Sequence, residues 1–227
     1  MRQALWLEAA QDVVFEGCPA VRPFPVRSGR RVAPGWWWSS TTGRLVGYGS
    51  GVMRTQLMLL DRDPEVVALA CRPVELVWRE GGRGVGHAPQ LMVRLRDGSG
   101  LLVDCVGRSG PSPRLAGRAR VVAAAAEAVG WGYRLAGPPD PVLVANVRWL
   151  AGYRHPRYGA GPWVPAVVEV FGSPRPAVEA VWELGDPIVV WPAVFHALWS
   201  GVLRVRLDEP LHERAVVWVA RQEAEAA

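Results

Sequence analysis

The spacing of hydrophobic residues along the first half of the chain predicts a helix followed by strands. Between Ser50 and Asp61 the apolar residues approach helical spacing, and Ser50 is a suitable N-cap. The segment VVALACRPVELVW at 66–78 is typical of one strand or a bent pair of strands. The stretch HAPQLMVRLRDGSGLLVDCVG at 87–107 then predicts two strands joined by a tight turn at Asp97–Gly100.

The pattern returns to helical spacing after this hairpin. An alanine-rich helix is predicted from Arg114 to Val129, where Gly130 ends it. A further strand is predicted on WGYRLA at 131–136, and a further helix begins with Asp140 as cap and Pro141 in its first turn. We therefore expect an α/β domain in which helices flank a mixed sheet.

The last third of the chain has a different pattern. The polar, Gly- and Pro-rich stretch HPRYGAGPW at 155–163 is typical of a linker. Two helices are predicted at 173–185 and 186–201, followed by a hairpin of VLRVRL and RAVVWVA. This order is typical of a small winged-helix domain. The expected division is a first domain at 1–154, a linker at 155–163 and a winged-helix-like domain at 164–227.

Composition narrows the possible environments and partners. The sequence contains no run of 18 apolar residues, so no transmembrane helix is predicted. The N-terminus lacks the apolar block of a signal peptide. Three widely spaced cysteines form neither a disulfide framework nor a zinc signature, which favours a cytoplasmic location. The net charge of +5 favours a polyanionic partner. All 26 basic residues are arginine, so a mechanism that requires lysine is excluded.

Six stretches, in order, resemble the TnsA-like endonuclease subunits of heteromeric transposases. They are GWWWSSTTGRLVGYGS, LMLLDRDPEVVALACRP, HAP, DGSGLLVD, DPVLVANVRWLAGYRHPR and GDPIVVWPAVFHALWSGVLRVRL. Together they lie within roughly residues 20 to 215. The resemblance implies a restriction-endonuclease-like domain of the PD-(D/E)XK type, followed by a winged helix.

The resemblance also implies the positions of a metal-dependent nuclease site. The family's helix glutamate falls at Met53, its aspartate after His-x-Pro falls at Gln90, and its acid-x-basic pair falls at Asp104 and Val106. Mg²⁺ prefers oxygen ligands, whereas a methionine sulfur is soft and a valine cannot orient a water. We therefore expect a degenerate site with no intact catalytic residue and no metal, in which Asp104 is a remnant without a basic partner. His87 is either a relic of the site or a structural residue in the extended segment that leads into a strand.

Two groups of basic residues are candidates for DNA contact. In RWLAGYRHPRY, basic side chains alternate with tyrosines before the linker; in the predicted wing, arginines alternate on one strand with another opposite them. Each group is equally well explained as a solvated surface, and cations are favoured at the end of a helix in any case. The candidates are Arg148, Arg154, His155, Arg157, Arg204, Arg206 and Arg214.

These features predict a catalytically inactive nuclease-fold protein that acts as a DNA-binding or assembly subunit. Its expected partners are duplex DNA and a protein of transposase, ATPase or nuclease type, with a homodimer also possible and no membrane. One alternative is a metal-dependent endonuclease whose site has migrated or is completed by a partner; only this alternative requires Mg²⁺ as a cofactor. Another is a repurposed regulatory or defence component.

Overall fold

The computed structural model describes residues 3–24, 34–159 and 163–220. They have the mixed α/β fold that the sequence predicted, with seven α-helices and several sheets. The chain forms two compact units, Met1–Pro138 and Pro139–Ala227. In the described ranges, no helix has both the length and the apolar character needed to cross a bilayer.

The boundary between the units lies earlier in the chain than the expected linker at 155–163, of which residues 160–162 lie outside the described residues. The difference comes from α4 (Pro141–Leu150), which was expected in the first domain. This helix packs against α7 (Pro187–Trp199) of the second unit. The buried Asn146 of α4 also donates hydrogen bonds to the carbonyls of Leu207 and Glu209, at 3.0 and 2.6 Å.

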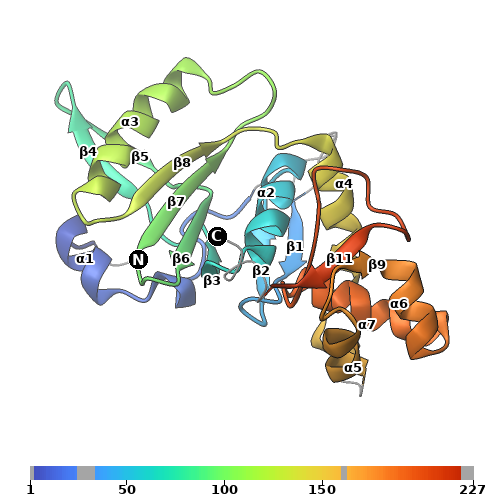
Figure 1. Ribbon diagram of the computed structural model, residues 1–227. Coiled ribbons are helices and arrows are strands. Elements are labelled where there is room, and N and C mark those ends of the chain that lie inside the picture. Colours follow the sequence, from blue (N-terminus) through green and yellow to red (C-terminus); the bar gives the residue numbers. More distant parts are fainter. Residues whose placement is uncertain (1–2, 25–33, 160–162, 221–227) are drawn as a thin grey trace. The chain divides into compact units, whose positions relative to one another are not determined.

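The first unit is built on a four-stranded mixed sheet (Figure 1). Its order is β3 (Val66–Cys71), β6 (Leu91–Leu95), β7 (Gly100–Cys105) and β8 (Gly132–Ala136). The first three strands are antiparallel, and β8 runs parallel to β7. Every residue of β7 is buried, so both faces of the sheet are covered at this strand.

Two helices cover opposite faces of this sheet (Figure 1). Ser50 and Ser112 cap α2 (Gly51–Arg62) and α3 (Pro113–Glu127), respectively. Strand pairing puts Met92 beside Leu102, and both pack in a cluster with residues of α3 and α1 (Trp6–Asp12) but with none of α2. The α2 helix also contacts β7, so it covers the other face.

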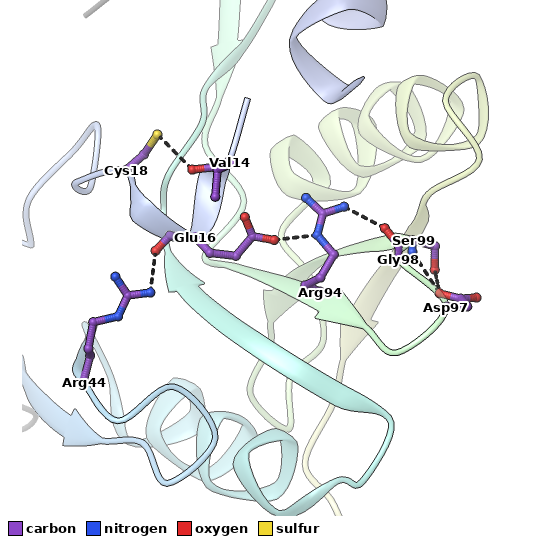
Figure 2. A network of polar contacts seen from close by, with 8 residues as sticks. All are labelled: Val14, Glu16, Cys18, Arg44, Arg94, Asp97, Gly98 and Ser99. Atoms are coloured by element: carbon purple, nitrogen blue, oxygen red, sulfur yellow. Dashed lines mark hydrogen bonds and ion pairs between the residues drawn. The ribbon is translucent and has the colours of Figure 1, made fainter. Parts of the chain in front are cut away.

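Two hairpins complete the first unit. One pairs β1 (Gly35–Trp38) with β2 (Leu45–Tyr48), and the other pairs β4 (Leu76–Glu80) with β5 (Arg83–His87). The segment expected to hold one strand or a bent pair therefore holds two separate strands, and β5 was not predicted. A 3₁₀ turn, η1 (Phe15–Gly17), is joined to the sheet through Glu16 and Arg94 (Figure 2).

The second unit combines helices with a small three-stranded sheet. The predicted helices are present as α6 (Ala177–Leu184) and α7, and the predicted hairpin is present as β10 (Leu203–Val205) and β11 (Val216–Val219). The strand β9 (Arg175–Pro176) pairs with β11 and was not predicted. The remaining elements are η2 (Ala151–Tyr153), η3 (Pro156–Tyr158) and α5 (Trp163–Val170).

Candidate functional site

Asp104 lies on β7 with none of its surface exposed, and protein groups surround its carboxylate. The Nε2 atom of His87 is 2.7 Å from Oδ2, and the Tyr133 hydroxyl donates to the same oxygen at 2.8 Å. The backbone N–H of Gln90 donates to Oδ1 at 3.3 Å. The expectation that Asp104 has no basic partner is therefore wrong, because the end of β5 presents an imidazole to it. Buried carboxylates need such partners to offset their desolvation.

The buried carboxylate also changes the acidity of its neighbours. Burial raises the pKa of the Tyr133 phenol well above its usual range, and the charge of Asp104 and its hydrogen bond raise it further. Burial also raises the pKa of the Cys105 thiol to about 12, with a smaller contribution from Asp104. Tyr133 therefore remains a hydrogen-bond donor across the ordinary pH range, which stabilises the Asp104 carboxylate.

The structure brings two of the four predicted site positions into contact. Gln90 bonds to Asp104 through its backbone and donates from its side chain to the carbonyl of Cys105 at 3.3 Å. Val106 follows β7, is buried, and donates its backbone N–H to the carbonyl of Ala136. Met53 is fully buried on α2, on the far side of the sheet from the cluster that contains Leu102. The four positions therefore do not form an open cleft.

These residues do not fit a magnesium ion. Both oxygens of Asp104 already accept hydrogen bonds from protein groups, and the side chain has no exposed surface. Met53 supplies a sulfur, which is a poor ligand for a hard cation. Within the described ranges there is no group of three or more His, Cys, Asp or Glu side chains arranged to hold a metal ion.

Asp61 is a second buried carboxylate in the first unit, and it has a different role. It lies near the end of α2 and accepts hydrogen bonds from the indole of Trp37 at 2.8 Å and the hydroxyl of Ser39 at 2.5 Å. The backbone N–H groups of Ser40 and Thr41 donate to it at 3.1 and 3.0 Å. Asp61 therefore fixes the turn between β1 and β2 and does not supply a ligand to the Asp104 cluster.

The candidates of the first basic group lie on α4 and the two short turns that follow it. Arg148, His155 and Arg157 are exposed, whereas Arg154 is half-buried and donates to the carbonyl of Ala151 at 2.6 Å. The guanidinium of Arg157 lies 4.7 Å from the ring centre of Tyr158 and donates to its hydroxyl. Arg154 and Arg157 are therefore already engaged by groups of the same segment.

The wing residues differ from the predicted arrangement. Arg204 on β10 faces Trp218, and Arg214 lies in the connection before β11, where it is exposed. Arg206 lies just after β10 and forms ion pairs with Asp208 and Glu209 at 2.8 and 3.0 Å. These arginines do not form the alternating basic strand that the sequence predicted, because the hairpin strands are shorter than expected.

The sequence identified Asp104 but not Tyr133 as its partner, and it left open whether His87 belongs to the site. Tyr133 lies on β8, which pairs in parallel with β7 and sets Tyr133 beside Leu102. Because side chains alternate along a strand, Tyr133 and Asp104 share one face of the sheet. A tyrosine in a strand predicted to pair with the Asp104 strand was the available signal.

In comparisons with known proteins, the chain matches no family model and no curated protein. Its function must therefore be inferred from its own residues, above all from the surroundings of Asp104.

Proposed function

We propose that the chain is a catalytically inactive, TnsA-like nuclease-fold protein that acts as a DNA-binding or assembly subunit. Its partner is a protein of transposase, ATPase or nuclease type. The observation that carries the proposal is the state of Asp104, the one acid retained at the positions implied by the resemblance. It is fully buried and accepts hydrogen bonds from His87, Tyr133 and Gln90.

The proposed folds are a restriction-endonuclease-like domain and a winged helix. The first is supported by the order of α2, three antiparallel strands, α3 and the parallel strand β8. The second is supported by the order α5, β9, α6, α7, β10 and β11, in which the short strand pairs with the last one. Both assignments follow from connectivity and belong to the proposal.

The absence of catalysis follows from access and charge. A nuclease must place metal-activated water and phosphate oxygens against its ligands. Asp104 has no exposed surface, and a phosphodiester cannot reach it without displacing His87 or Tyr133. Val106, at the position of the basic residue, offers no charge to a phosphate.

Charge is distributed unequally between the two units, which supports different roles for them. Residues 1–138 contain 18 arginines and 11 acidic residues, whereas residues 139–227 contain eight arginines and ten acidic residues. In a winged helix, the helix at the position of α7 commonly enters the DNA groove. Here α7 contains no arginine, and its exposed Ile188 and Val189 are apolar. We therefore propose that the first unit contacts DNA and the second contacts the protein partner. This proposal moves the DNA contact away from the seven basic candidates of the sequence, all of which lie in the second unit.

The proposal is tested by measuring DNA binding and cleavage on the same preparation. Fluorescence anisotropy should show salt-sensitive, sequence-tolerant binding to duplex DNA at about 50 mM salt. A supercoiled plasmid should remain uncut with Mg²⁺ or Mn²⁺, as in an EDTA control. Metal-dependent nicking that is abolished by Asp104→Asn would contradict the proposal.

The assembly role needs a separate test. Affinity purification from the source cells, followed by mass spectrometry, should recover a transposase-, ATPase- or nuclease-type protein. Ile188→Glu with Val189→Glu should remove that protein, because both side chains are exposed on α7. Val77→Glu, at an exposed apolar position on β4, is the matched control and should retain it. Retention of the partner by the α7 variant would contradict the assigned role of the second unit.

A further inference from the structure

We propose that the solvent-facing side of α3 is a binding surface for the phosphate backbone of duplex DNA. This inference rests on the proposed DNA-binding function and names the surface that carries it. The α3 surface is defined by Arg108, Arg114, Arg118 and Arg120, together with the small exposed residues between them. Residues 105–126 contain these four arginines and no acidic residue. The one acid of α3 is Glu127, exposed at the last residue of the helix, so the positive charge is concentrated toward its N-terminal part.

Helix geometry separates the arginines from the buried side of α3. Ala119, Val122 and Ala126 are buried and mark the side that faces the sheet. At about 100° per residue, Gly117, Val121 and Ala124 point to the opposite side. On the same projection, Arg114 and Arg118 flank this exposed strip on one edge and Arg120 on the other. Arg108 is exposed in the loop that leads into the helix.

The four arginines are not neutralised within the described part of the chain. None of them takes part in a salt bridge or a side-chain hydrogen bond among the described residues. Arg94 provides the contrast, because it donates to Glu16 at 2.5 Å and to the carbonyl of Gly98 at 2.8 Å (Figure 2). Arg22 is likewise paired with Glu75. The α3 guanidinium groups keep their donors available for a ligand.

Gly117 is an independent indication that a partner approaches α3 closely. It lies inside the helix, where glycine is among the poorest residues for helix stability. A Cβ built at Gly117 meets no atom within 4 Å, so packing within the described chain does not require the missing side chain. With Ala124, Gly117 leaves little side-chain bulk on either side of the exposed Val121, so a backbone can approach the helix at these two positions.

Phosphate of duplex DNA fits this surface better than a bilayer or single-stranded nucleic acid. A guanidinium fork matches phosphate oxygens, and Arg114 and Arg118 are separated by a rise of about 6 Å along the helix. Among the exposed large hydrophobic residues, only Val121 lies on α3, which leaves little to insert into a membrane. The helix also carries no aromatic residue on which unpaired bases would stack.

The charge test compares two triple variants of the full chain. Arg114→Gln, Arg118→Gln and Arg120→Gln remove three charges from the α3 surface. Arg79→Gln, Arg83→Gln and Arg96→Gln remove three charges from exposed positions elsewhere in the same unit. Circular dichroism and thermal unfolding serve as the control that both variants fold.

We expect the α3 variant to bind a duplex about tenfold more weakly at about 100 mM salt, and the slope of log K against log salt to fall by about two. The control variant should lose less than about threefold in affinity, because its α3 arginines are intact. Equal losses in the two variants would overturn the inference, as would an unchanged α3 variant; both leave the proposed function standing. Failure of the wild type to bind at about 50 mM salt would overturn the proposed DNA binding and this inference together.

A shape test uses Gly117 and leaves the charge unchanged. Gly117→Leu should weaken duplex binding several-fold while the protein remains folded, and Gly117→Ala should retain more of the affinity. Equal affinity of all three proteins would contradict a close approach to α3. Stronger, α3-dependent binding to phosphatidylserine vesicles than to the duplex would contradict the choice of nucleic acid as the partner.

Discussion

The first unit buries two aspartates to a similar degree, but it surrounds them with different chemistry. Asp61 is 4% exposed and Asp104 is fully buried. The donors to Asp61 come from Trp37 and the turn at 39–41, which are neutral groups close together in the chain. Two of the donors to Asp104 are the titratable side chains of His87 and Tyr133, from two different strands. The first carboxylate orders a turn, and the second joins strands where the resemblance implies a metal ligand.

Removal of the Asp61 carboxylate should produce the largest loss of stability. Asp61→Ala leaves an indole N–H, a hydroxyl and two backbone N–H groups without their acceptor. We expect the free energy of unfolding to fall by about 3 to 5 kcal/mol. Urea unfolding followed by circular dichroism measures it. A loss below about 1 kcal/mol would show that these bonds do not stabilise the turn.

Asp104→Ala should cost less, about 2 to 4 kcal/mol, because fewer donors lose their acceptor. Removal of a remnant carboxylate without a basic partner would be neutral or stabilising, but the partners found in the structure lead us to expect the opposite sign. Duplex affinity should stay unchanged, since Asp104 has no exposed surface. The comparison fails if Asp104→Ala stabilises the protein or destabilises it more than Asp61→Ala.

Tyr133→Phe isolates one bond of the Asp104 cluster. The ring is retained while the 2.8 Å hydrogen bond is lost, so we expect a loss of about 1 kcal/mol. In the background of Asp104→Ala, the same substitution should have a smaller effect. A double-mutant cycle measures this coupling, and purely additive losses would show that the hydroxyl does not stabilise the native carboxylate.

The smallest expected effect concerns thiol acidity. Burial, followed by the charge of Asp104, raises the pKa of Cys105 from 9.0 to about 12. The folded protein holds this proton where the unfolded chain releases it, so Cys105 should lower the unfolding free energy as pH rises above 9. Asp104→Asn should lower the Cys105 pKa, whereas Asp61→Asn should not change it. Alkylation rates against pH measure both variants, and equal responses would contradict the predicted specificity.

The sequence predicted elements that carry local signals and missed those that do not. The Ser50 cap marks α2, an alanine-rich run ended by Gly130 marks α3, and two apolar runs joined by a tight turn mark β6 and β7. In contrast, β9 has only two residues, one of them proline, so no period is visible. The same limit applies to the site. Tyr133 reaches Asp104 through a parallel strand pair across 29 residues, and only the fold sets that proximity.

Whether Asp104 still binds a metal is tested by titrating the wild-type protein with Mn²⁺ or Mg²⁺ in isothermal calorimetry. It requires neither the protein partner nor the DNA site. We expect no saturable binding that depends on Asp104, because its oxygens are hydrogen-bonded to His87, Tyr133 and Gln90. Saturable binding that is lost in Asp104→Asn while the fold is retained would contradict this expectation.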